Sequence, residues 1–181
     1  MRIGIYAGSF NPVHNGHIKV VNFLLEKDYV DQVLLLPTPS YWDKQNLAPM
    51  QDRINMLKYF ENEKVKVDTI HNHYEYTYQV FRSLKKDYPN EELYLIIGSD
   101  NIEKFHLWEK VDELLENKII ILKRDNTKVE EYLKRWNTNS FIYVKDFEPI
   151  AASSTNIRKE KDTSNLDERV LQYIKEHKLY K

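Results

Sequence analysis

The 181-residue sequence contains no cysteine, which excludes a disulfide framework, a thiolate zinc site, an iron–sulfur cluster and a cysteine nucleophile. It has no excess charge of either sign, because 27 Lys and Arg stand against 28 Asp and Glu. Proteins that bind nucleic acid usually carry a basic excess or stripe, so we expect no nucleic-acid partner. The longest aliphatic runs, residues 33–36 and 119–122, are far shorter than the roughly 20 residues that span a bilayer. We therefore expect no membrane association.

The first residues also lack the features of a targeting segment. Residues 1–6 (Met-Arg-Ile-Gly-Ile-Tyr) run directly into an expected strand, so we expect no signal peptide. The absence of cysteine fits a reducing compartment. These features predict a cytoplasmic protein.

What the sequence does contain is a regular alternation of strand and helix patterns. Short β-branched or aliphatic runs occupy residues 2–6, 32–36, 65–68, 93–97, 118–122 and 141–144. Several are apolar at successive positions, which is typical of strands buried on both faces of a parallel sheet. Between them, apolar residues recur with helical spacing. The pattern predicts an α/β fold, a Rossmann-like open parallel sheet flanked by helices.

The length and the absence of a linker or repeat predict one domain over residues 1–181. Its last part, about residues 150–181, is expected to be a small helical segment packed on the sheet. We predict a short helix over residues 153–159, a turn over 161–165 and an amphipathic helix over 166–178. Its inward-facing residues are expected to be Leu166, Val170, Leu171 and Ile174. The sequence leaves homo-oligomerisation open.

The first expected strand leads into a candidate phosphate site, residues 7–17 (Ala-Gly-Ser-Phe-Asn-Pro-Val-His-Asn-Gly-His). We expect Gly8 to let the backbone turn and approach a ligand closely. A helix is expected to begin at about Gly16, and the unpaired N–H groups of a helix start attract anions. His14 and His17, three residues apart, would present two imidazoles there. The segment therefore predicts a polyphosphate site.

Two common phosphate-binding motifs are missing from this segment. The Walker motif needs Gly-Lys-Ser/Thr and the dinucleotide fingerprint needs three closely spaced glycines, which excludes a P-loop ATPase and a typical NAD-dependent dehydrogenase. Paired histidines also bind zinc, and His71 and His73 could supply further imidazoles. A zinc site therefore stays open as an alternative.

Two motifs at opposite ends of the chain resemble those of a known superfamily. Residues 8–12 (Gly-Ser-Phe-Asn-Pro) and 14–17 (His-Asn-Gly-His) resemble the first signature of the nucleotidyltransferases with an HxGH motif. Residues 153–158 (Ser-Ser-Thr-Asn-Ile-Arg) resemble their second signature, SSTxxR. The resemblance implies that the two segments bind one nucleotide together.

The segments between these motifs resemble those of bacterial nicotinate-nucleotide adenylyltransferases. Residues 96–100 (Ile-Ile-Gly-Ser-Asp), residues 105–108 (Phe-His-Leu-Trp) and residues 76–77 (Tyr-Thr) are similar to stretches of that family. The loop after the second strand departs from it, because this loop keeps Lys44 but lacks the family's histidine. What replaces that histidine stays open.

The resemblance implies adenylyl transfer from ATP to nicotinate mononucleotide, giving deamido-NAD and pyrophosphate in NAD biosynthesis, with Mg²⁺ accompanying ATP. The implied partners are two small molecules, ATP and a pyridine mononucleotide. The implied catalytic residues are His14, His17 and Arg158. The implied ATP-binding residues are Gly8, Ser9, Phe10, His14, His17, Gly98, Asp100, Arg124, Ser154, Thr155 and Arg158. The implied mononucleotide-binding residues are Ser9, Lys44, Thr77 and Trp108.

Several of these residues also have a purely structural interpretation. These are Ser154, Thr155 and Asp100 as helix N-caps, Trp108 as a core aromatic, and Lys44 and Arg124 as solvated surface charges. The function has alternatives too. One is a related adenylyltransferase acting on nicotinamide mononucleotide or phosphopantetheine, and the other is a non-catalytic nucleotide-binding sensor.

Overall fold

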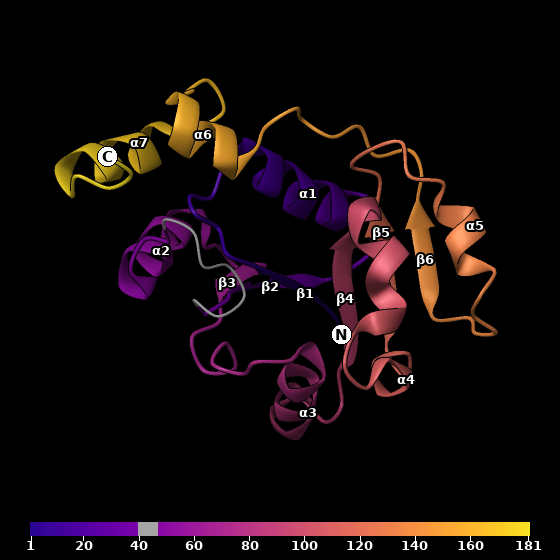
Figure 1. Cartoon of the computed structure of the whole chain (residues 1–181). Coiled ribbons are helices and arrows are strands. Elements are labelled where there is room, and N and C mark those ends of the chain that lie inside the picture. The colour runs from indigo at the N-terminus through magenta and orange to yellow at the C-terminus, as the bar shows by residue number, and fades with distance from the viewer. Residues whose placement is uncertain (40–46) are drawn as a thin grey trace.

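The computed structural model describes residues 1–39 and 47–181. Across these residues, a six-stranded parallel sheet in the order β3-β2-β1-β4-β5-β6 forms the centre of the molecule (Figure 1). The strands are β1 (Arg2–Gly8), β2 (Gln32–Pro37), β3 (Val65–Val67), β4 (Glu92–Gly98), β5 (Lys118–Leu122) and β6 (Phe141–Val144). The expected strands and the Rossmann-like fold are confirmed.

Helices cover both faces of this sheet (Figure 1). One face carries α1 (Asn15–Glu26), α2 (Met50–Leu57), α6 (Ser154–Glu160) and α7 (Glu168–Glu176). The other carries α3 (Thr77–Asp87), the 3-10 segment η2 (Ser99–Leu107), α4 (Val111–Leu114) and α5 (Val129–Leu133). A second 3-10 segment, η1 (Lys58–Phe60), follows α2. No helix among the described residues is long and apolar enough to cross a membrane.

The strands are apolar at successive positions because both of their faces are buried. In β4, Tyr94 and Ile96 pack in the cluster that contains α1 and α7. Leu93, Leu95 and Ile97 pack in the cluster that contains α3 and η2. Since successive side chains of a strand point to opposite faces, a continuous apolar run supplies both clusters.

The C-terminal helices complete one face of the fold, as expected. Leu166 and Val170 are buried in the same cluster as α1 and α2. Leu171 and Ile174 are partly buried against that cluster. α7 begins after its N-cap Asp167, whose side chain accepts from a backbone N–H, so the helix is shorter than the predicted 166–178. The inward face of the helix is therefore confirmed.

The two central strands define where a ligand can enter. β1 pairs with β2 on one side and with β4 on the other, so the strand order reverses between β1 and β4. In open α/β sheets, this reversal creates a crevice beyond the carboxyl ends of the two strands. Here those ends are Gly8 and Gly98. The loops that follow these glycines form the candidate site.

Candidate functional site

Two histidines cap the start of α1. His14 is the N-cap, and its Nδ1 accepts a hydrogen bond from the Gly16 N–H at 3.0 Å. His17 Nδ1 accepts from the His14 N–H, also at 3.0 Å. These bonds assign the proton of each neutral ring to Nε2. Because the rings stack with centroids 3.8 Å apart, two Nε2–H donors lie on adjacent imidazoles.

Burial keeps both imidazoles uncharged. Burial, and next the positive charge of Arg124, lower the pKa of His14 to about 4. Burial, His14 and Arg124 lower the pKa of His17 well below its usual value. Both rings are therefore neutral hydrogen-bond donors at pH 7. A bound anion would raise both pKa values, because a negative charge favours the protonated form.

Gly16 makes room for the capping ring of His14. A Cβ atom at Gly16 would lie 2.7 Å from Cε1 and 2.9 Å from Nδ1 of His14. Distances this short require the imidazole to move. The glycine between the two histidines is thus needed for the ring position that caps α1.

The turn after β1 does not depend on a special backbone conformation at Gly8, so that part of our prediction was wrong, whereas close approach of a ligand at Gly8 stays a prediction. No glycine of the described residues has a positive φ, whereas Phe10 has a φ of 47°. A Cβ on Gly8 would lie 3.5 Å from the Phe10 ring, an ordinary contact. The Phe10 ring is buried edge-on against Tyr6 and His17, with centroids 5.4 and 4.9 Å away. This packing stabilises the left-handed backbone at Phe10.

The second motif lies directly against the first. Ser154 Oγ donates a hydrogen bond of 2.8 Å to the Pro12 carbonyl, although the two residues are 142 apart in sequence. Arg158 Nη1 donates one of 2.8 Å to the Asn11 carbonyl, across 147 residues. Two side chains of α6 therefore hold the loop that leads to His14.

The N-cap interpretations of three predicted residues were wrong. Ser153 is the N-cap of α6, because its hydroxyl accepts from a backbone N–H in the first turn. Ser154 is the first helical residue, and Thr155 is exposed in the same turn. Asp100 lies in the first turn of η2, whose N-cap is Gly98.

A cavity of about 230 Å³ lies at the carboxyl ends of β1 and β4. Besides apolar side chains of the sheet, it is lined by four predicted residues, Thr77, Gly98, Trp108 and Arg124. Tyr6 and Asn101 also line it, and sequence reasoning missed both. Asn101 directly follows the resembling segment 96–100, which was a usable signal. The cavity occupies the crevice where a Rossmann-like sheet binds its ligand.

Gly98 lets Arg124 and Asp100 approach the end of β4. A Cβ atom at Gly98 would lie 2.3 Å from Cδ of Arg124 and 2.4 Å from Oδ1 of Asp100. The buried hydroxyl of Ser99 accepts from the Arg124 N–H at 2.9 Å and donates to Asp125 Oδ1 at 2.8 Å. Arg124 is exposed, but these contacts fix its backbone and place its side chain at the cavity.

Trp108 lies between the core and the solvent. Its ring packs against the buried Phe105 with centroids 4.9 Å apart, and it is partly exposed. Trp108 and Thr77 line the cavity at the strand ends and also an open hollow of about 460 Å³. Glu75 and Glu109 line the same hollow. An aromatic face is thus available beside the cavity.

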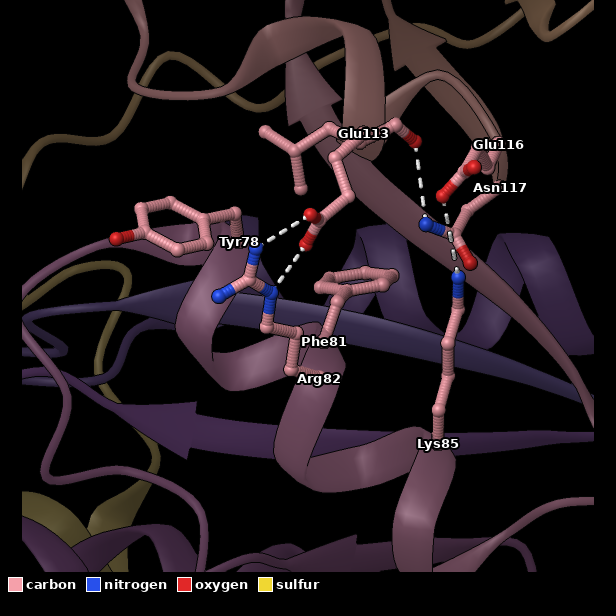
Figure 2. A pocket seen from close by; sticks show the side chains of 8 residues that line it. Tyr78, Phe81, Arg82, Lys85, Glu113, Glu116 and Asn117 are labelled. Atoms are coloured by element: carbon pink, nitrogen blue, oxygen red, sulfur yellow. Dashed lines mark hydrogen bonds and ion pairs between the residues drawn. The ribbon is translucent and has the colours of Figure 1, made fainter.

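Another hollow, between α3 and α4, contains none of the predicted residues (Figure 2). Its charges pair with each other. Arg82 donates from Nε and Nη2 to the two carboxylate oxygens of Glu113, each at 2.7 Å. Lys85 lies 3.9 Å from a carboxylate oxygen of Glu116. These ion pairs connect α3 to α4 and to the residues that follow it, and they form no reactive arrangement.

The zinc alternative finds no support at His71. Its Nδ1 lies 2.7 Å from Oδ2 of Asp68, and its Nε2 lies 2.6 Å from Oδ2 of Asp87. Burial lowers the pKa of His71, but the hydrogen bonds to Asp87 and Asp68 outweigh burial and raise it overall. Both ring nitrogens are therefore engaged by carboxylates. Within residues 1–39 and 47–181, no group of three His, Cys, Asp or Glu could hold a metal ion.

Sequence reasoning also missed Arg53, which binds the loop between β1 and α1, residues 9–14. We call this segment the phosphate loop, after the anion site predicted there. Its side chain is 1% exposed, and its Nη1 donates to the carbonyls of Ser9 at 2.9 Å and Thr38 at 2.8 Å. Its Nε donates to the Ala48 carbonyl at 3.0 Å. A signal was present, since Arg53 stands four residues before Leu57 and therefore on the apolar face of α2.

The predicted residues form two adjacent groups. Around the phosphate loop lie Gly8, Ser9, Phe10, His14, His17, Ser154 and Arg158, and around the cavity lie Thr77, Gly98, Asp100, Trp108 and Arg124. Ala7, the residue before Gly8, lines the cavity and links the groups. Thr155 is exposed on α6. Lys44 lies in residues 40–46, outside the described residues.

Comparison with known proteins agrees with this arrangement. The sequence model of the cytidylyltransferase-like family matches residues 5–160, a span that contains both motifs. The fold resembles that of a Plasmodium falciparum nicotinic acid mononucleotide adenylyltransferase complexed with NaAD, with a TM-score of 0.80 at 23% sequence identity. That likeness covers 99% of this chain and 97% of the other. Fold and motifs together define a nucleotidyltransferase.

Two curated relatives show to which family of nucleotidyltransferases the chain belongs. A probable nicotinate-nucleotide adenylyltransferase of Aquifex aeolicus is 38% identical over 79% of this chain and 94% of its own length. A nicotinate-nucleotide adenylyltransferase of Bacillus subtilis is 32% identical over 99% of this chain and 98% of its own length. The chain therefore belongs to the nicotinate-nucleotide adenylyltransferase family.

Proposed function

We propose that this chain transfers the adenylyl group of ATP to nicotinate mononucleotide, which produces deamido-NAD and pyrophosphate in NAD biosynthesis. The observation that carries this proposal is the joining of the two motifs by the Ser154–Pro12 and Arg158–Asn11 hydrogen bonds. These bonds bring a guanidinium to the loop that ends in the two neutral histidines. Membership of the family supports the same reaction.

The reaction needs positioning and charge stabilisation rather than a general base. A phosphate oxygen of the mononucleotide attacks the α-phosphorus of ATP and forms a new P–O bond. The bond from the α-phosphorus to the oxygen that bridges it to the β-phosphate breaks, and pyrophosphate leaves with that electron pair. Since the nucleophile is already an anion, no proton must be removed. Transfers of this kind depend on donors aimed at the developing charge.

The phosphate loop and α6 supply those donors. We propose that the Nε2–H groups of His14 and His17 bind the triphosphate, with His17 closest to the α-phosphate. Because both rings are neutral before ATP binds, they stabilise added negative charge without first losing a counter-charge. Ser154, Thr155 and Arg158 would bind the β- and γ-phosphates. Backbone N–H groups of Ser9 and Phe10, beside Gly8, would line the cradle.

The cavity at the strand ends would hold the nucleosides. We propose that Trp108 stacks on the pyridine ring and that backbone groups of Thr77 lie near its carboxylate, because both residues line the cavity. Gly98 and Asp100 would lie against ATP, where the carboxylate can accept from ribose hydroxyls. Arg124, held across Gly98, would contact phosphate. Lys44 remains a proposed contact of the mononucleotide.

Mg²⁺ is expected to accompany ATP, since a triphosphate needs charge neutralisation. The described residues offer no group of three His, Cys, Asp or Glu to hold it. We therefore propose that phosphate oxygens, rather than a protein cage, are its main ligands. We also propose that residues 1–181 act as one unit and that the enzyme works in the cytoplasm, where ATP is available.

A side-by-side assay of acceptors tests the proposed function. Pyrophosphate release is measured with ATP and Mg²⁺ and with nicotinate mononucleotide, nicotinamide mononucleotide or phosphopantetheine. We expect strong turnover with nicotinate mononucleotide and little with the other two. Turnover only with another acceptor would assign the chain to a different pathway. No turnover by a folded chain that binds ATP would favour a nucleotide sensor.

A further inference from the structure

The C-terminal end of the chain reaches into the phosphate loop. Tyr180, the penultimate residue, is only 9% exposed. Its Oη donates a hydrogen bond of 2.6 Å to Oδ1 of Asn11, a residue that is fully buried. The two residues are 169 apart in sequence. None of the roles proposed above uses this contact.

Three carbonyl groups of the phosphate loop accept hydrogen bonds from side chains of other elements. The Ser9 carbonyl accepts from Arg53, the Asn11 carbonyl from Arg158 and the Pro12 carbonyl from Ser154. Carbonyl oxygens repel phosphate oxygens, whereas N–H groups attract them. A loop whose carbonyls are bound by its own protein does not present them to an anion. The side chains that hold this loop therefore determine whether it is an anion site.

Asn11 is the junction of these contacts. Its Oδ1 accepts from both Tyr180 Oη at 2.6 Å and the Ala48 N–H at 3.0 Å. Its main-chain carbonyl accepts from Arg158 Nη1 at 2.8 Å. Whatever fixes the Asn11 side chain therefore also fixes the carbonyl that orients the Arg158 guanidinium.

The surroundings of Tyr180 hold it in place and keep its hydroxyl a neutral donor. Burial raises the pKa of Tyr180 above its usual value, against the opposing charges of Arg158 and Arg53. The Tyr180 carbonyl accepts a hydrogen bond from Nζ of Lys161, the C-cap residue of α6. The penultimate residue is thus attached through both its side chain and its main chain.

We propose that Tyr180 is a positioning residue for the triphosphate of ATP, which acts through Asn11 on Arg158. This proposal rests on the proposed function in one respect, that Arg158 binds ATP. It does not depend on which acceptor receives the adenylyl group. Arg158 touches the substrate in this account, and Tyr180 does not.

The variant Tyr180→Phe removes the hydroxyl alone, and Tyr173→Phe is its matched control. Tyr173 is a buried tyrosine of α7, and its hydroxyl bonds to Asp52, at 2.6 Å, and Asn55 of α2 rather than to the phosphate loop. Binding of ATP to each variant is measured by calorimetry without an acceptor, together with the melting temperature and steady-state kinetics.

We expect Tyr180→Phe to raise the Kd for ATP about three- to tenfold, the scale of one lost hydrogen bond between uncharged groups. The KM for the mononucleotide should stay within twofold. Tyr173→Phe should leave the Kd for ATP within twofold. Its melting temperature should fall by about as much as that of Tyr180→Phe. In an Arg158→Ala background, Tyr180→Phe should add less than a twofold effect.

A Kd for ATP within twofold of wild type in Tyr180→Phe would overturn the inference, as would a full effect in the Arg158→Ala background. If Tyr180→Phe does not fold, the exposed substitution Lys161→Met tests the same attachment. Lys161→Met should also raise the Kd for ATP. An unchanged Kd for ATP in this variant would contradict the proposed role of Tyr180. A wild-type chain that binds no ATP would instead overturn the proposed function itself.

Discussion

Replacing Gly16 with alanine should displace the His14 ring while leaving the stability of the fold nearly unchanged. The new Cβ would lie 2.7 Å from Cε1 of His14, and an ordinary contact begins at 3.4 Å, so the imidazole must retreat by about 0.7 Å. That movement weakens the bond from the Gly16 N–H to Nδ1 and disturbs the stack on His17. A misplacement of about 1 Å at a reacting centre can cost about 10²-fold in rate.

The effect on stability should be small because two contributions oppose each other. Loss of an N-cap interaction costs about 1 kcal/mol. Alanine in place of glycine within a helix contributes up to about 1 kcal/mol in the other direction. We therefore expect Gly16→Ala to lower turnover by about 10- to 100-fold while the free energy of unfolding changes by less than about 1 kcal/mol.

Pyrophosphate release at saturating ATP and mononucleotide measures turnover, and urea unfolding measures stability. Gly8→Ala is the stability control, because its Cβ would make only an ordinary 3.5 Å contact with Phe10. A folded Gly16→Ala variant with turnover within threefold of wild type would refute the reasoning, since the His14 ring position would then not matter.

Three further perturbations test the same site. His17→Ala should lower turnover by about 10²–10³-fold with the fold intact, the scale of one lost donor to developing charge; a loss below threefold would contradict its role. Trp108→Ala should raise the Kd for the mononucleotide more than that for ATP, and equal weakening of both would exclude stacking. Since burial lowers the pKa of His14 to about 4, the unfolded chain binds a proton near pH 6 that the folded chain does not. The free energy of unfolding should therefore fall by about 3 kcal/mol between pH 6.5 and 4. Urea midpoints of wild type and His14→Ala isolate this contribution, and identical pH profiles would show that His14 does not cause it.

The fold could be predicted because its strands are buried on both faces. In a chain with regular strand–helix alternation, a continuous apolar run such as residues 93–97 strongly favours a central strand, and β4 covers that run. No apolar spacing predicted α5, which has five residues and buries only Val129. A helix that short presents no repeating apolar face, so its sequence carries no periodic signal.

The site could be predicted only in part, because adjacent residues with similar chemistry take different roles. Ser153, Ser154 and Thr155 can all cap a helix, and only the backbone conformation assigns the N-cap to Ser153. The left-handed residue of the phosphate loop is Phe10 rather than a glycine, because ring packing outweighs intrinsic preference.

The contact between Tyr180 and Asn11 left no signal in the sequence, unlike the pairing of the two motifs. The bond from Tyr180 to Asn11 spans nearly the whole chain, and neither residue type is unusual in its local context. Such contacts depend on the packing of α6 and α7 against α1 and α2. They can be read only from the folded molecule.

The central claim is that the α-phosphorus of ATP is the atom attacked, and isotope transfer tests it most directly. The chain is incubated with nicotinate mononucleotide and with ATP labelled at either the α- or the γ-phosphorus. We predict that all transferred α-label appears in the dinucleotide and all released γ-label in pyrophosphate. Transfer of the γ-label to the mononucleotide, or release of the α-label as AMP without dinucleotide, would contradict the account.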